Sequence, residues 1–109
     1  MKILYHDFLE IQTEKILASE QAYATIGADS VPVYSLPGFL ISDTLAKALA
    51  KHDQAPFAAS YFEVQGLRVY NLRSRQGSDV DVGKIAAQYG GGGHKHAAGF
   101  SVQIKDIDL

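Results

Sequence analysis

Four consecutive glycines, followed at once by His-Lys-His, form the stretch best suited to chemistry, GGGGHKHAAGF (residues 90–100). Glycine loses more backbone entropy on folding than any other residue, so an ordered run of four needs a reason. Residues without Cβ let backbone N–H groups converge into a concave nest and let an oxygen-rich group approach closely. His94 adds one or two N–H donors beside them. Gly91, Gly92, Gly93 and His94 therefore predict a phosphate-binding site.

A tight structural turn is the alternative interpretation of the same glycines. Gly90 is explained by the C′ position of a helix, where positive φ favours glycine. The run is not a P-loop, because no Gly-Lys-Ser/Thr ends it, and not a dinucleotide fingerprint, because it follows a predicted helix. Composition alone leaves the turn and the anion site both open.

Basic side chains gather near the glycine run. Arg73 and Arg75 lie at the end of a predicted strand and the start of its loop, where a guanidinium can contact phosphate or a base edge. Lys95 and His96 are possible auxiliary ligands, and solvated surface charge is the alternative for each. The net charge is −2, but residues 66–109 hold six basic and four acidic side chains. This local positive field suits a small anionic ligand better than a long polyanion.

Other catalytic chemistries find little support in the sequence. Two histidines, at 94 and 96, could bind zinc only with further ligands, and the chain has no cysteine. It also has no Gly-x-Ser-x-Gly elbow and no paired-carboxylate signature. We therefore assign no catalytic residue and no metal site to this chain.

Length and composition indicate one ordinary globular domain. The chain has 109 residues, of which 47% are hydrophobic and 20% charged. No apolar run approaches the roughly 18 residues of a membrane span, and the N-terminus lacks the apolar region of a signal peptide. We expect a cytoplasmic protein with no membrane partner.

Hydrophobic periodicity predicts an α+β domain with one mixed sheet covered by helices, in the order α-β-α-β-β-α-β. The expected elements are a helix over 7–24, a strand over 31–36, a helix after an N-cap at Ser42, a hairpin of strands 57–64 and 67–74 turning at Gln65-Gly66, a helix over 82–89 capped by Asp81, and a last strand over 99–104. The first helix carries Phe8, Leu9 and Ile16 on a wide apolar face.

Residues 72–100, LRSRQGSDVDVGKIAAQYGGGGHKHAAGF, resemble the DHH-associated domain of the first type (DHHA1). That domain is the C-terminal substrate-binding domain of the DHH-family phosphoesterases. The family pattern is an Arg-Ser on a strand, a Val-rich helix start, Ile-Ala, Gly-Gly-Gly-His and Ala-Ala-Gly-Phe. The positions that match it are Arg73, Ser74, Val80, Val82, Ile85, Ala86, Gly91, Gly92, Gly93, His94, Ala97, Ala98, Gly99 and Phe100.

The resemblance implies a role in phosphoester hydrolysis. In the family, an N-terminal domain with an Asp-His-His motif holds two divalent metals, usually manganese, and the C-terminal domain binds the substrate. Carried onto this sequence, the family pattern places the 91–94 loop at a phosphate and Arg73 at a phosphate or base. The Asp-His-His motif does not occur in this chain. We therefore expect no cofactor in this chain, a DHH catalytic domain in cis or in trans, and no hydrolysis by this chain alone.

Two functions follow from the resemblance. The first is the binding domain of such an enzyme, for a phosphorylated nucleotide, a short oligonucleotide or polyphosphate, with residues 1–30 as a linker-like helix and 31–109 as the globular unit. The second is a free-standing nucleotide- or nucleic-acid-binding protein. The related tRNA-editing domain of alanyl-tRNA synthetases is less well supported, because the histidine follows the glycines and no editing site is found. The apolar face of helix 7–24 further predicts a homodimer.

Overall fold

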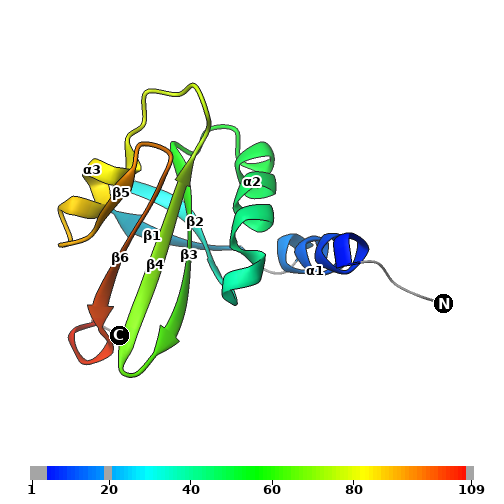
Figure 1. Cartoon of the computed structure of the whole chain (residues 1–109). Helices are drawn as coiled ribbons and strands as arrows, with labels where there is room; N and C mark the ends of the chain where they lie inside the picture. The colour runs from blue at the N-terminus through cyan, green and yellow to red at the C-terminus, as the bar shows by residue number, and fades with distance from the viewer. Residues whose placement is uncertain (1–4, 19–20, 108–109) are drawn as a thin grey trace.

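A mixed six-stranded sheet organises the chain (Figure 1). The computed structural model describes residues 5–18 and 21–107, with side chains for 11–17 and 21–107. The strands are β1 (Ala22–Ile26), β2 (Asp29–Ser35), β3 (Phe57–Val64), β4 (Leu67–Ser74), β5 (Gly92–His94) and β6 (Ala97–Gln103). Their spatial order is β1-β2-β3-β4-β6-β5, with β2 and β3 parallel and the other neighbours antiparallel. The predicted α+β class with a mixed sheet is confirmed.

Among the residues that the structure describes, three α-helices accompany the sheet: α1 (Tyr5–Ala18), α2 (Ile41–Lys51) and α3 (Val82–Ala87). Two short 3₁₀ turns, η1 (Gly38–Leu40) and η2 (Ile104–Asp106), precede α2 and follow β6. The helix α2 forms the crossover between the parallel strands β2 and β3. Parallel neighbours need such a crossover, whereas antiparallel neighbours can be joined by a tight turn.

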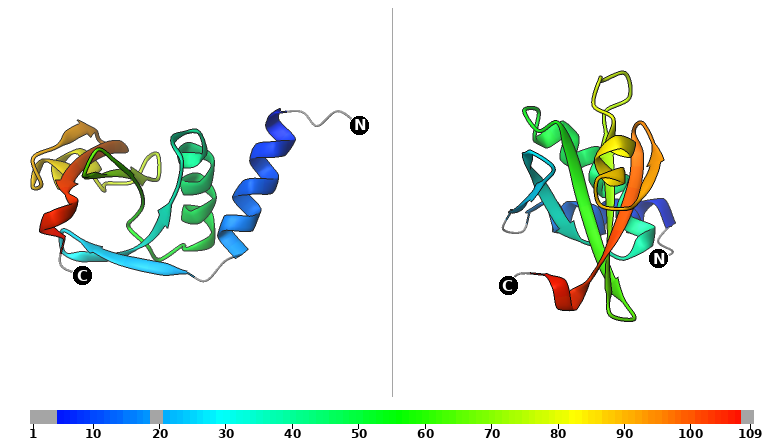
Figure 2. Two further views of the ribbon diagram at one scale, coloured as in Figure 1. Left: turned by 90° about the horizontal axis from the view of Figure 1, so that it is seen from below. Right: turned by 90° about the vertical axis from the view of Figure 1, so that its left-hand side faces the viewer.

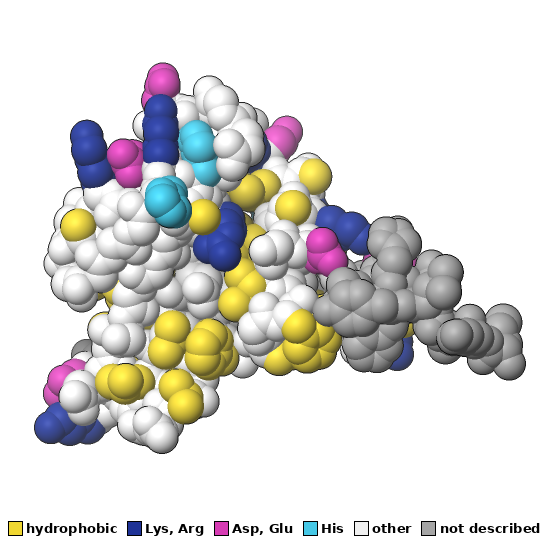
Figure 3. Space-filling view, viewed as in Figure 1, with side chains coloured by type: hydrophobic (Ala, Val, Ile, Leu, Met, Phe, Trp, Pro, Cys, Tyr) yellow, Lys and Arg dark blue, Asp and Glu magenta, His cyan; other side chains and the backbone are white. Residues whose placement is uncertain are grey.

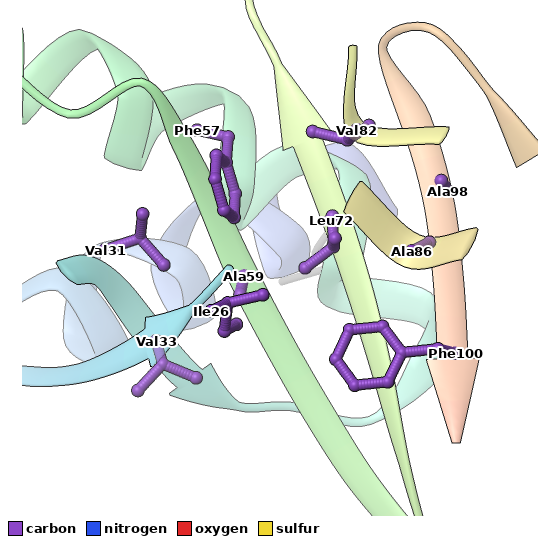
Figure 4. Packing of buried hydrophobic residues seen from close by; sticks show 10 residues of the cluster. All are labelled: Ile26, Val31, Val33, Phe57, Ala59, Leu72, Val82, Ala86, Ala98 and Phe100. Atoms are coloured by element: carbon purple, nitrogen blue, oxygen red, sulfur yellow. The ribbon is translucent and has the colours of Figure 1, made fainter. Parts of the chain in front are cut away.

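Each face of the sheet has its own apolar core, because successive side chains of a strand point to opposite faces. On one face, Val82 and Ala86 of α3 pack over Phe57, Leu72 and Phe100 (Figure 4). On the other face, residues of α2 pack over Ala58 of β3. We call these the α3 face and the α2 face. Leu72 is fully buried on the α3 face, so its neighbour Arg73 projects from the α2 face.

Two sequence signals are confirmed at the level of single residues. Gln65 and Gly66 both have positive φ, 49° and 79°, which is the two-residue turn that suits a right-twisted hairpin. The turn fixes β3 against β4, with Val64 opposite Leu67. Asp81 caps α3, since its carboxylate accepts from the backbone N–H of Lys84 at 3.1 Å.

The expected helix over 7–24 is wrong at its C-terminal end. The helix α1 ends at Ala18, and residues 22–26 form β1, which the sequence analysis did not predict. Hydrogen bonding to β2, with Ile26 opposite Asp29, overrides the helical periodicity of this segment.

The structure also differs from the sequence prediction at α2, β5 and α3. The cap of α2 is Leu40 rather than Ser42, because η1 leads directly into the helix; β5 is an additional strand; and α3 ends at Ala87, before the expected residue 89.

The first helix lies beside α2, at the opposite end of the molecule from α3 (Figure 2). Ile16 and Leu17 pack against the α2 core, and Lys51 Nζ donates to the carbonyl of Leu17 at 2.7 Å. Ile11 is 45% exposed, while the side chains of Phe8 and Leu9 lie outside the described residues. No helix in the part of the chain that the structure describes is long and apolar enough to cross a membrane.

Candidate ligand-binding site

The glycine run forms a turn and an edge strand. Gly90 has positive φ, 84°, as expected after a helix, and the N–H of Gly91 donates to Ala86 O at 3.0 Å. Residues 92–94 then extend as β5 along β6. The expected nest is therefore wrong, because N–H groups along an extended strand point alternately to opposite sides and do not converge.

Two of the glycines are required by close packing of backbone. A Cβ at Gly91 would lie 2.6 Å from the Cβ of Phe100, and a Cβ at Gly93 would lie 2.6 Å from the Cα of Ala98. Gly93 also has a φ of 147°, which side chains rarely adopt. A Cβ at Gly92 would meet nothing within 4 Å. Close backbone packing therefore explains why residues 91 and 93 are glycines. At Gly92, by contrast, the position of a Cβ is open space.

The strand register brings His94 and Arg73 onto one face. His94 is opposite Ala97 across β5 and β6, and Ala97 is opposite Arg73 across β6 and β4. Directly opposite residues of antiparallel strands project to the same side, so the three side chains form one row on the α2 face. Figure 3 shows histidine side chains beside a basic side chain on one face of the molecule. Two predicted ligands 21 positions apart in sequence thus lie on the same face of the sheet, two strands apart with Ala97 between them.

A pocket of about 530 Å³ lies between α2 and the part of this row formed by Arg73 and Ala97, and His94 is not among its lining residues. This volume is typical of small-molecule sites. One wall is apolar and comes from α2, and the other carries most of the polar groups of the β4 and β6 ends. The lining residues are Ser42, Ala46, Leu49, Ala50, Arg73, Ser74, Arg75, Gln76, His96 and Ala97. The pocket can therefore hold a ligand that has both an anionic and an apolar part.

Arg73 is the arginine of the pocket whose guanidinium has the fewer hydrogen-bond partners among the described residues. Its Nη1 donates to the carbonyl of Leu72 at 3.0 Å. Burial lowers the pKa of the Arg73 guanidinium, since desolvation disfavours the charged form. Within residues 5–18 and 21–107 we find no carboxylate that pairs with it. A half-buried guanidinium with most of its donors free is well suited to accept an anion.

Arg75 has a different environment. Its guanidinium donates to the carbonyls of Leu49, His52 and Ala55 at 2.7–2.8 Å. Those carbonyls lie in the last turn of α2 and just beyond it, where basic groups stabilise exposed helix carbonyls. Arg75 therefore holds the helical wall of the pocket in place. An auxiliary contact of Arg75 with a ligand stays a prediction. The same holds for Lys95, whose side chain is exposed and whose backbone carbonyl accepts a hydrogen bond from Val82 N–H at 2.8 Å.

His96 lines the pocket and contacts a residue to which the sequence analysis gave no site role. Its Nδ1 lies 2.7 Å from the Oγ of Ser74.

The sequence analysis also did not single out Asn71. This residue lies on the α2 face opposite Gly99, and its Nδ2 is buried with no partner in the part of the chain described. The two-residue alternation of β4, which places Asn71 and Arg73 on one face, was the available signal.

The described residues contain no cluster of three or more His, Asp or Glu side chains placed to hold a metal ion. The guanidinium of Arg73, which lines the pocket, is suited to hydrogen bonding with an anion. The geometry therefore supports ligand recognition at this site.

The chain is similar to known proteins in its sequence pattern and in its fold. The sequence pattern of the DHHA1 domain matches residues 40–108, which include α2, the pocket and the glycine run. Among solved structures, the chain is similar to the pGpG-specific phosphodiesterase PggH from Vibrio cholerae, with a TM-score of 0.58 and 16% sequence identity. The similarity covers 91% of this chain and 35% of that one, so the chain spans about a third of its length. None of the curated proteins compared with the chain matches it. Because the domain pattern covers more than half of the sequence, the chain belongs to the DHHA1 domain family.

Proposed function

We propose that this chain is the substrate-binding part of a DHH-family phosphoesterase and binds the phosphate of a nucleotide or short oligonucleotide. The observation that carries the proposal is the row of His94, Ala97 and Arg73 beside the pocket. It combines an exposed imidazole with a half-buried guanidinium that has no carboxylate partner among the described residues. A dianionic phosphate would supply the missing countercharge.

The apolar wall on α2 favours a nucleotide over inorganic polyphosphate. Ala46, Leu49 and Ala50 form a wall across from Arg73 and offer nothing to a ligand made only of phosphate. A sugar or base beside the phosphate would cover this wall and exclude water from it. The similar phosphodiesterase is specific for pGpG, so this linear dinucleotide is a natural ligand to test.

A catalytic DHH domain, in cis or in trans, would supply hydrolysis. In the family it holds two divalent metals, and this domain would present the substrate phosphate to it. Two-metal sites activate the attacking water and stabilise the leaving oxygen. On this proposal the present chain contributes affinity and orientation, which is why we assign it no catalytic residue.

Calorimetric titration of the chain with pGpG, GMP, inorganic phosphate and tripolyphosphate tests the proposal. We expect dissociation constants in the micromolar range or weaker, because only half of a two-domain cleft is present. His94→Ala should weaken GMP binding by about tenfold or more, as expected for a hydrogen bond to a charged group. His52→Ala is the matched control, since that imidazole bonds Gln21 at 3.1 Å, away from the row. Equal affinity of the parent and His94→Ala would contradict the proposal.

A further inference from the structure

The hydroxyl of Ser74 is placed where it fixes the state of a neighbouring imidazole. Ser74 is only 5% exposed, and its Oγ has three polar neighbours. These are the Nδ1 of His96 at 2.7 Å, the carbonyl of Val80 at 3.1 Å and the carbonyl of Lys95 at 3.4 Å. A hydroxyl has one proton to donate and two lone pairs to accept with, so the three contacts cannot all be donations.

The number of protons available to Ser74 and His96 favours one arrangement of these hydrogen bonds. If Ser74 donated to Nδ1 of His96, its oxygen would face two carbonyl oxygens with no hydrogen between them. If Ser74 instead donates to the carbonyl of Val80, Nδ1–H of His96 donates to Oγ, and two hydrogen bonds form in place of one. Buried polar groups are nearly always satisfied, because an unmade hydrogen bond is expensive in a region without water. The geometry therefore favours His96 with its proton on Nδ1.

When the imidazole is neutral, this arrangement gives the pocket an acceptor. In neutral His96 with a proton on Nδ1, Nε2 carries a lone pair. No hydrogen bond to Nε2 is found within the described ranges, and His96 lines the pocket together with Arg73 and Ser74. A phosphate dianion has no proton to donate, so Nε2 is unsuited to it.

We propose that the Ser74–His96 pair reads the nucleoside part of the ligand, with Nε2 of His96 accepting a hydrogen bond from a sugar hydroxyl or a base amino group. Ser74 is the positioning residue, and His96 determines specificity. This inference rests on the proposed function. It divides the pocket between Arg73, which takes the anion, and His96, which distinguishes a nucleotide from phosphate or polyphosphate.

The imidazole tautomer can be measured directly in the unliganded chain by long-range ¹H–¹⁵N NMR correlation at a pH where both rings are neutral. We expect His96 to be protonated on Nδ1. His52 is an internal control of opposite state, because its Nε2 lies 3.1 Å from Gln21 Oε1, which also accepts from Tyr34 at 2.9 Å. Ser74→Ala should remove the preference at His96 and leave His52 unchanged. His96 protonated on Nε2 in the parent chain would overturn the inference.

Binding to ligand analogues tests the contact itself. His96→Ala should weaken GMP binding by about tenfold and leave the affinity for inorganic phosphate unchanged. Of 2′-deoxy-GMP, 3′-deoxy-GMP and IMP, the analogue that lacks the donor group should bind the parent about tenfold more weakly than GMP does. His96→Ala should not weaken the binding of that analogue further. The analogue that behaves so identifies the sugar or the base as the source of the donor.

The two proposals fail in different ways. If the parent binds GMP and neither His96→Ala nor any of the three analogues changes the affinity, this inference is wrong and the proposed function stands. If His96→Ala weakens phosphate and GMP equally, His96 is an anion ligand and the inference is again wrong. If the parent binds no nucleotide, both proposals are wrong.

Discussion

Replacing Arg73 by methionine should separate ligand binding from folding. The guanidinium is half-buried, and its Nη1 donates to Leu72 O, which leaves four N–H donors for a ligand. A phosphate held by two of these donors makes two charge-assisted hydrogen bonds, each worth about 1.5–3 kcal/mol. Taking the lower value for each, Arg73→Met removes about 3 kcal/mol, which weakens nucleotide binding by more than a hundredfold.

The same substitution should do little harm to the fold. Burial lowers the pKa of Arg73, which means that the folded state disfavours this charge, and no carboxylate among the described residues compensates it. Methionine keeps an unbranched apolar stem in place of the arginine stem and removes the desolvated charge. We expect the free energy of unfolding in urea to fall by no more than about 1 kcal/mol, or to rise.

Calorimetric titration with GMP and urea denaturation of the same preparations measure both quantities. Arg68→Met is the matched control on the same strand. Arg68 pairs with Glu63 at 3.0 Å and lies 4.3 Å from the ring centroid of Tyr61, on the α3 face. It should keep the affinity of the parent. The reasoning is refuted if Arg73→Met binds GMP within threefold of the parent, or if it loses several kcal/mol of stability.

Further outcomes follow from the same structure. Gly91→Ala should destabilise the chain by about 1–3 kcal/mol in urea because its Cβ would overlap β6, whereas Gly92→Ala should fold like the parent and bind GMP more weakly. Equal stability of the two variants would contradict the packing explanation. Arg75→Ala should lower unfolding free energy by about 3 kcal/mol, since three carbonyls at the end of α2 lose a charged donor, and unchanged stability would show that they are otherwise satisfied. The predicted homodimer through residues 7–24 should dissociate in Ile11→Glu, and a parent chain that sediments as a monomer at high concentration would exclude it.

The sequence was most informative where local chemistry decides the conformation. Gln65-Gly66 predicted the hairpin because both positions need positive φ, and Asp81 predicted the start of α3 because its carboxylate can reach the backbone three residues on. The α+β class followed from the alternation of such elements. In each case, neighbours within a few residues determine the outcome.

The strands that sequence analysis missed depend on distant partners. Residues 22–26 have a helical pattern of apolar residues, and only pairing with β2 makes them a strand. The three residues of β5 are too short to show any periodicity and are held by β6. The glycine run was therefore expected to be a nest, although its amides are arranged along an extended strand.

In the candidate site, too, some features could be predicted from the local sequence and others depend on distant strand pairing. His94 and Arg73 were predicted from their residue types, but their position in one row depends on the register of β5, β6 and β4. The contact of Ser74 with His96 joins residues 22 positions apart and could not be read from either local sequence. Residue types thus predicted the chemistry, and long-range strand pairing determined which groups meet.

The most direct test of the central claim is a ¹H–¹⁵N correlation spectrum of the chain during titration with GMP. If the pocket beside the His94–Arg73 row binds the nucleotide phosphate, the largest shifts fall on the backbone amides of residues 92–98 and on Nε–H of Arg73. The amide shifts of residues 92–98 should be absent in Arg73→Met. The account is contradicted if the largest shifts fall instead around Tyr89 and β1, where a second hollow of about 610 Å³ lies on the other side of the sheet.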